Sequence, residues 1–101
     1  MENKTYSVII DPAAFSQILD CVSFLKRVSF EAAENLFKDI MDSIYSLENM
    51  PLRNPVVAEA MVLDQEERKI LIGNGRYYAL YCIEGNKIYV EYFGDSRKAH
   101  K

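Results

Sequence analysis

Residues 68–93 read RKILIGNGRYYALYCIEGNKIYVEYF, and this stretch decides the fold. Three runs in it are rich in β-branched and aromatic residues, at 68–72, 76–83 and 87–93, and predict strands. The sequences GNG and EGN stand between them and are typical of tight turns. Because strands joined by tight turns pair antiparallel, the second half of the chain is predicted to form an antiparallel meander. A further candidate strand, at 56–63, precedes it.

The first half of the chain predicts one strand and two helices. Residues 5–10 are mostly β-branched or aromatic and predict a strand. Asp11-Pro12 is a typical helix start, and apolar residues at helical spacing predict a helix over 12–28. Ser29 is a candidate cap for a second helix, which the apolar spacing extends to about residue 48. The connection is so short that the two helices must pack as an antiparallel hairpin.

A proline-containing linker at 49–55 separates the helices from the meander. The predicted order is therefore an N-terminal strand, a two-helix hairpin, and three to four antiparallel strands. Helices grouped on one face of a mostly antiparallel sheet make an α+β domain, and we expect residues 1–101 to form one such domain.

Composition excludes several classes of protein. The chain has 101 residues, of which half are apolar, and a formal net charge of −3. No run approaches the roughly 20 apolar residues of a membrane span, so no membrane partner is expected. Cys21 and Cys82 lie far apart in apolar segments, where buried thiols in a reducing, cytoplasmic protein are expected. With a lone His100 and no cysteine–histidine cluster, neither a metal nor another cofactor is predicted.

The charge is unevenly spread along the chain. Residues 1–67 carry 5 basic and 12 acidic residues, a net charge of −7, whereas residues 68–101 carry 7 basic and 3 acidic residues, a net charge of +4. Because local potential steers charged partners, the basic sheet is a candidate site for an anionic partner. The alternative is that these charged side chains are ordinary solvated residues at the strand edges.

Aromatic residues accompany the basic residues on the predicted sheet. Alternation along a strand places Tyr77 and Tyr81 on one face, where a core position is expected, and Tyr78 on the other. Tyr78 is equally compatible with a core role and with stacking on single-stranded RNA. In the last strand, strict alternation groups Ile88, Val90 and Tyr92 against Tyr89, Glu91 and Phe93.

Several short motifs follow one another over residues 5–98. They are DPAA at 11–14, Ala32-Ala33, LENMP at 47–51, RKILIG at 68–73, Tyr77 and Tyr81 four residues apart, and IYVEYF at 88–93 before Asp95-Ser96-Arg97. Their order and spacing resemble the RelE/ParE superfamily of toxins from bacterial type II toxin–antitoxin (plasmid stabilisation) modules. The resemblance implies a toxin neutralised by a cognate antitoxin that wraps around it, and it leaves a homodimer open.

The resemblance implies one of two targets. RelE-like members cut messenger RNA on the ribosome without a metal, and ParE-like members block DNA gyrase. RNA cleavage requires a 2′-hydroxyl to be deprotonated, phosphorane charge to be stabilised and the leaving oxygen to be protonated. Because the chain is acidic overall, the nuclease activity is less favoured than the fold alone would suggest.

The resemblance carries over to particular residues only in part. Arg68 or Lys69 occupies the place of the family's basic strand residue, and Arg97 that of its C-terminal arginine. His100 could act as acid or base, although we expect residues 94–101 to include a flexible tail. The predicted catalytic set is therefore Arg68, Arg97 and His100, and the predicted RNA- or target-binding set is Lys69, Arg76, Tyr78 and Lys98.

One departure from the family pattern leaves a third class of function open. Where cleaving members often have Tyr-Arg in the strand after the turn, this chain has Tyr77-Tyr78. The loss of that arginine weakens the phosphate clamp. The alternative is a non-toxic, degenerate protein that keeps the fold and acts as a protein-binding module.

Overall fold

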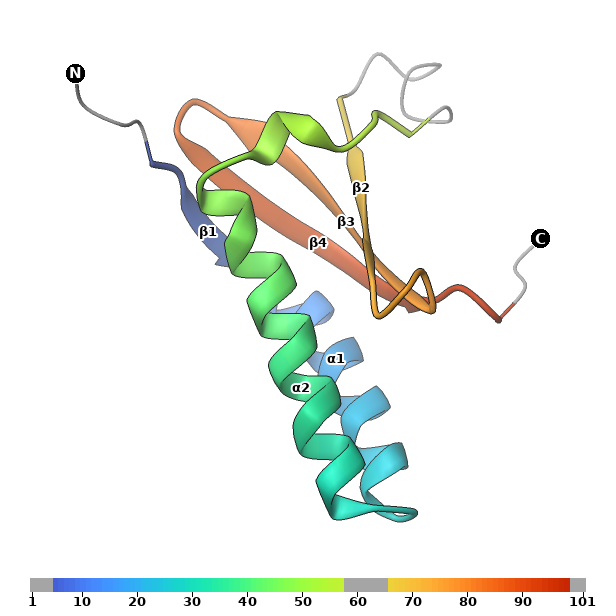
Figure 1. Ribbon diagram of the computed structural model, residues 1–101. Helices are drawn as coiled ribbons and strands as arrows, with labels where there is room; N and C mark the ends of the chain where they lie inside the picture. The colour runs from blue at the N-terminus through green and yellow to red at the C-terminus, as the bar shows by residue number, and fades with distance from the viewer. Residues whose placement is uncertain (1–4, 58–65, 99–101) are drawn as a thin grey trace.

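The computed structural model describes residues 5–57 and 66–98 (Figure 1). A short strand, β1 (Ser7–Ile10), leads into helices α1 (Pro12–Lys26) and α2 (Phe30–Tyr45). Two single-turn 3-10 helices, η1 (Ser46–Glu48) and η2 (Pro51–Arg53), follow. Strands β2 (Arg68–Ile72), β3 (Tyr77–Glu84) and β4 (Lys87–Asp95) complete the chain. The predicted α+β order of strand, helical hairpin and antiparallel strands is confirmed.

The four strands form one mixed sheet in the order β1-β4-β3-β2. Strands β2, β3 and β4 are antiparallel neighbours, as the meander predicted. Strand β1 joins the sheet at the β4 edge and runs parallel to β4. Because β1 reaches only to Val90 of its partner, no strand of residues 5–57 or 66–98 lies beside the C-terminal half of β4 on that edge. That half of β4 borders the site described below.

Both helices begin at the predicted caps. The Asp11 carboxylate accepts a hydrogen bond from the backbone N–H of Ala13 at 2.8 Å, and the Ser29 hydroxyl accepts one from Ala32 at 3.1 Å. Helix α1 ends at Lys26 and not at the predicted residue 28, because Arg27 already bonds three residues back, to Phe24. Helix α2 ends at Tyr45, and the chain tightens into η1 up to the predicted residue 48.

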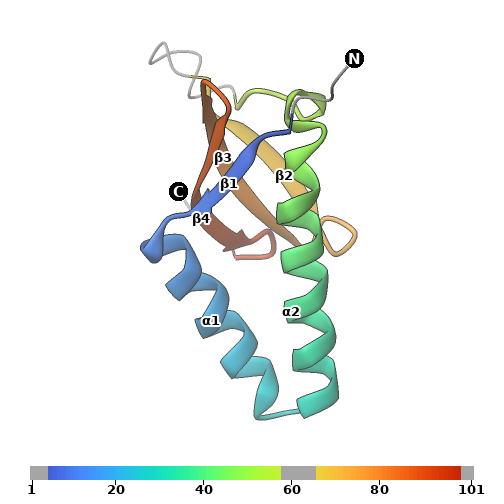
Figure 2. The same cartoon turned by 90° about the vertical axis from the view of Figure 1, so that its left-hand side faces the viewer.

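The core lies between the helical hairpin and one face of the sheet. It contains apolar residues of both helices and of the strands, but not the exposed residues of β1. Its fully buried residues include Tyr81, Ile18, Ile40, Ile44, Ile88 and Val90. Tyr77 and Tyr81 are both buried, as predicted. The far end of the hairpin extends beyond the sheet, with the two helices joined at its tip (Figure 2).

Because of a bulge in β4, the last residues of this strand lie on other faces than predicted. The register shifts between Leu80 and Tyr81, so that Leu80 pairs with Tyr92 and Tyr81 pairs with Val90. Glu91 is therefore an extra residue, and every side chain after it changes face. Phe93 is buried with Ile88 and Val90, while Tyr92 is 40% exposed on the opposite face. Strict alternation groups Tyr92 with Ile88 and Val90, and that grouping is wrong.

Two further sequence expectations need comment. Cys21 and Cys82 are free thiols but only half-buried, because Cys21 borders a groove and Cys82 lies on the sheet face away from the helices. The predicted strand at 56–63 lies mostly outside the described residues, and its first residue, Val56, forms an isolated bridge with Arg68. In the described residues no helix is long and apolar enough to cross a membrane.

Candidate binding groove at the C-terminal end of the sheet

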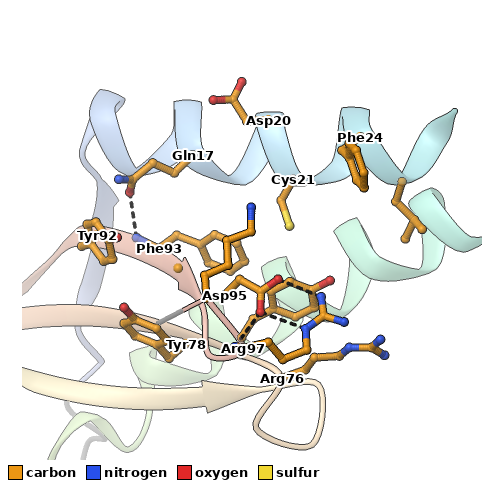
Figure 3. Close-up of a pocket in the computed structure, with 14 residues that line it drawn as sticks. Gln17, Asp20, Cys21, Phe24, Arg76, Tyr78, Tyr92, Phe93, Asp95 and Arg97 are labelled. Carbon is orange, nitrogen blue, oxygen red and sulfur yellow. Dashed lines mark hydrogen bonds and ion pairs between the residues drawn. The ribbon is translucent and has the colours of Figure 1, made fainter. Parts of the chain in front are cut away.

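A groove of about 820 Å³ lies between α1 and the C-terminal end of β4 (Figure 3). Helix α1 contributes Gln17, Asp20, Cys21, Phe24 and Leu25 to it. The side chain of Cys21 points toward the sheet, and that of Asp20 points away from it (Figure 3). The other wall comes from the ends of β3 and β4 and the residues beside them, namely Arg76, Tyr77, Tyr78, Tyr92, Phe93, Gly94, Asp95, Arg97 and Lys98. We call this space the C-terminal groove.

The free edge of β4 is fixed to α1 where the groove begins. Since β1 stops short, the backbone N–H of Phe93 has no strand partner at this edge, and it donates instead to Gln17 Oε1 at 2.9 Å (Figure 3). A buried N–H without an acceptor would be costly. The side-chain amide of Gln17 supplies the acceptor for Phe93 and so sets the spacing between α1 and β4.

Arg97 is neutralised inside the groove by Asp95. Its Nε and terminal nitrogen donate to the two carboxylate oxygens at 3.0 and 2.7 Å, and its backbone N–H donates to the same carboxylate at 2.8 Å. The guanidinium also lies 5.8 Å from the centre of the Tyr77 ring. A bidentate pair of this kind is geometrically specific and holds the arginine in one orientation.

Aromatic rings form most of the apolar lining. Tyr77 stacks on Phe93 on the core side, with ring centres 5.7 Å apart. Tyr78 packs against Tyr92 on the other side, at 5.9 Å. A Cβ added to Gly94 would lie 2.8 Å from the Tyr78 ring, so the glycine makes room for that pair. The bulge at Glu91 is what brings Tyr92 to Tyr78 and Phe93 to Tyr77.

Several titratable groups that line the groove have pKa values shifted away from neutrality. Hydrogen bonds from Arg97 lower the pKa of Asp95 to about 2. Burial raises the pKa of the Cys21 thiol and, together with the neighbouring Cys21, that of the Tyr77 hydroxyl. Burial and the neighbouring Tyr92 raise the pKa of Tyr78. At neutral pH Asp95 is therefore ionised, and the Cys21 thiol and the two tyrosine hydroxyls are neutral.

We expect acid to remove the contribution of Asp95 to stability. Because its folded-state pKa, about 2, lies below its usual value of 3.8, the ionised carboxylate stabilises the fold above about pH 4, and this contribution is lost as the pH falls toward 2. Urea midpoints measured from pH 2 to 5 should fall more steeply for the natural chain than for Asp95→Asn. Parallel curves would contradict the assignment.

The structure brings four of the predicted site residues together and places Arg68 and Lys69 elsewhere. Arg76, Tyr78, Arg97 and Lys98 all line the C-terminal groove. His100 lies outside the described residues.

Arg68 and Lys69 are not part of that groove. Arg68 lies across from buried Tyr81, and its guanidinium donates to the carbonyl of Asn54. Lys69 lies on the opposite sheet face, with its Nζ 4.8 Å from the centre of the Tyr78 ring. The catalytic roles given to Arg68, Arg97 and His100 remain predictions.

Sequence reasoning missed the contribution of α1 to the groove. Gln17, Cys21 and Phe24 belong to a helix that was read only as a core element. Phe24 is nevertheless 67% exposed, although it stands among apolar residues. Its helical phase relative to buried Ala14 and Ile18 could have shown that it lies off the core face.

The comparisons with known proteins place the fold. No protein-family model matches the sequence, and no curated protein matches it. A chain from a structure of the chromosomal ParDE TA system from P. aeruginosa matches with a TM-score of 0.72 at 12% sequence identity, over 92% of this chain and 98% of that chain. At this identity the likeness shows a shared fold, and it confirms the predicted arrangement of an N-terminal strand, a helical hairpin and a mixed sheet.

Proposed function

We propose that the chain is the toxin component of a type II toxin–antitoxin module and that it acts by binding a protein target of the DNA gyrase class. On this proposal it is not a nuclease. The toxin role is supported by the likeness to a chain of a ParDE TA system. That likeness extends over 92% of this chain and 98% of that chain.

The observation that carries the choice of target is the state of the two arginines predicted to stabilise phosphate charge. Arg97 is already paired in bidentate fashion with Asp95, and Arg68 donates to a backbone carbonyl near the other end of the sheet. An arginine acts on a transition state only where it is free to meet the developing charge. The two arginines lie on different parts of the sheet, and Arg97 is already paired, which favours protein binding over RNA cleavage. Arg68 donates from one terminal nitrogen, and its buried Nε has no hydrogen-bond partner in the described residues.

The C-terminal groove is the surface that we assign to the antitoxin. It combines exposed Phe24 and the pair Tyr78–Tyr92 with two cationic side chains that form no ion pair in the described part of the chain, Arg76 and Lys98. An amphipathic segment with acidic residues on one side and apolar residues on the other matches this lining. The cognate antitoxin is therefore proposed to place such a segment between α1 and the end of β4.

Growth measurements test the toxin role. Induction of the chain alone should arrest growth, and co-expression of a short adjacent reading frame with a DNA-binding N-terminal part should relieve the arrest. A chain that binds such a partner but causes no arrest would overturn the proposal in favour of the inert binding module.

A further inference from the structure

The sheet face that points away from the helices carries an exposed apolar band with charge at its sides. Leu71 is 60% exposed and Tyr92 40% exposed, and Leu80 and Tyr78 are half-buried between them. Cross-strand pairing places Leu71 beside Tyr78, and Leu80 beside both Lys69 and Tyr92. We call this surface the open face, and its residues are Lys69, Leu71, Tyr78, Leu80, Cys82, Glu91 and Tyr92.

The charges on the open face lie on opposite sides of β3. Lys69 is on β2, and Glu91, the bulge residue, is on β4, with Leu80 of β3 between the two strands. Both charged residues are exposed, and neither forms an ion pair within residues 5–57 and 66–98. The open face therefore carries Lys69 on its β2 side and Glu91 on its β4 side, with apolar residues between them. Glu67, the residue before β2, also lies beside Glu91.

We propose that the open face is a self-association surface, on which a second copy of the chain packs face to face about a two-fold axis that runs along β3. Such a rotation exchanges the β2 side with the β4 side. It places Lys69 opposite Glu91 of the second copy, and the reciprocal contact forms at the same time. The apolar middle meets itself, with Leu80 and Tyr78 near the axis. This proposal goes beyond the toxin activity and does not rest on it.

Two neighbouring carboxylates, Glu67 before β2 and Glu91 of β4, support a cationic neighbour on the open face. Burial and the nearby carboxylate of Glu91 raise the pKa of Glu67, and the thiol of Cys82 donates to Glu91 at 3.4 Å. Two like charges held this close are each more stable when a cation approaches. Lys69 of a second copy would supply that cation, whereas Lys69 of the same copy is held over the Tyr78 ring.

The size of the open face sets the expected strength of self-association. A strand of 8 residues such as β3 is ~26 Å long, and three strands are ~14 Å across, which gives roughly 400 Å² on each copy. Standard interfaces bury about 800 Å² on each partner. We therefore expect a reversible dimer whose population rises with concentration, and not an obligate one.

Sedimentation velocity of the purified chain tests the proposal, over roughly 10 µM to 1 mM, the range that suits a weak interface. The weight-average mass should rise from that of one chain toward that of two. Because the reciprocal ion pairs are exposed, moderate salt should lower the association constant of the natural chain. A mass of one chain at every concentration would overturn the proposal.

Charge reversal provides the matched variants. Lys69→Glu and Glu91→Lys should each be monomeric alone, since either one sets like charges against each other twice. An equimolar mixture of the two should again form dimers, because every contact between the unlike chains is then attractive. Lys26→Glu and Glu34→Lys, both on the exposed hairpin, are the controls and should leave the dimer unchanged.

Two results would show a different role for the open face. A mixture of the reversed variants that stays monomeric while both variants remain folded by circular dichroism would rule out the proposed pairing. A monomeric natural chain that instead binds a single-stranded oligoribonucleotide, with binding lost in Lys69→Glu, would assign the face to nucleic acid. Either result overturns self-association independently of whether the chain arrests growth.

Discussion

Replacing Tyr81 by alanine is expected to lower the free energy of unfolding by about 3–5 kcal/mol, the usual cost of removing a buried aromatic ring. Tyr81 is fully buried at the centre of β3. Its hydroxyl donates to the carbonyl of Pro51 and accepts a hydrogen bond from Asn54 Nδ2 at 3.1 Å. The ring therefore fills the core, and its hydroxyl holds the segment after the helices against the sheet.

The variant Tyr81→Phe separates these two contributions. It keeps the ring but leaves the buried Pro51 carbonyl and the Asn54 amide without their partner, which costs about 1–3 kcal/mol. Urea unfolding followed by far-UV circular dichroism measures both variants. If Tyr81→Phe were as stable as the natural chain, the hydroxyl would not be anchoring this segment, and the account of the segment would be wrong.

The second large effect is expected at Phe24 in the C-terminal groove. Phe24→Ser removes the apolar side chain that α1 presents to the groove. Truncation of a central aromatic contact typically weakens binding by about 2–4 kcal/mol, or roughly 30- to 1,000-fold. We therefore expect loss of antitoxin binding by calorimetry, with little change in stability because Phe24 is 67% exposed.

A matched variant makes this result interpretable. Leu52→Ser removes an apolar side chain of similar exposure, 62%, from η2, which lies outside the groove. It should bind the antitoxin as the natural chain does. Equal losses in the two variants would mean that exposed apolar area in general, and not the groove, determines binding.

Local sequence signals predicted the elements well where the chain has helix caps and tight turns. The Asp11 and Ser29 caps, the turn at 73–75 and the turn at 84–86 all lie at element boundaries in the structure. These signals act through backbone geometry within a few residues, so a single sequence carries them. The direction of β1 depends on which sheet edge receives it, and the sequence around β1 does not encode that choice.

The candidate site was less predictable for a specific physical reason. The bulge at Glu91 has no signature in the sequence, since no glycine marks it, yet it reverses the faces of Tyr92 and Phe93. A prediction that does not include the bulge cannot place Tyr78 against Tyr92 or Tyr77 against Phe93. Pairing of Arg97 with Asp95, two residues away, is compatible with the sequence, but only the structure shows that the charge is already neutralised.

The choice between a protein target and RNA cleavage is the central claim, and one experiment in cells tests it directly. The chain is induced, messenger 5′ ends are mapped, and the supercoiling of a reporter plasmid is measured in the same culture. We predict growth arrest with intact transcripts, loss of negative supercoiling and DNA breaks. Codon-phased cleavage of messengers that disappears in Arg97→Ala and Arg68→Ala, with supercoiling unchanged, would contradict the account.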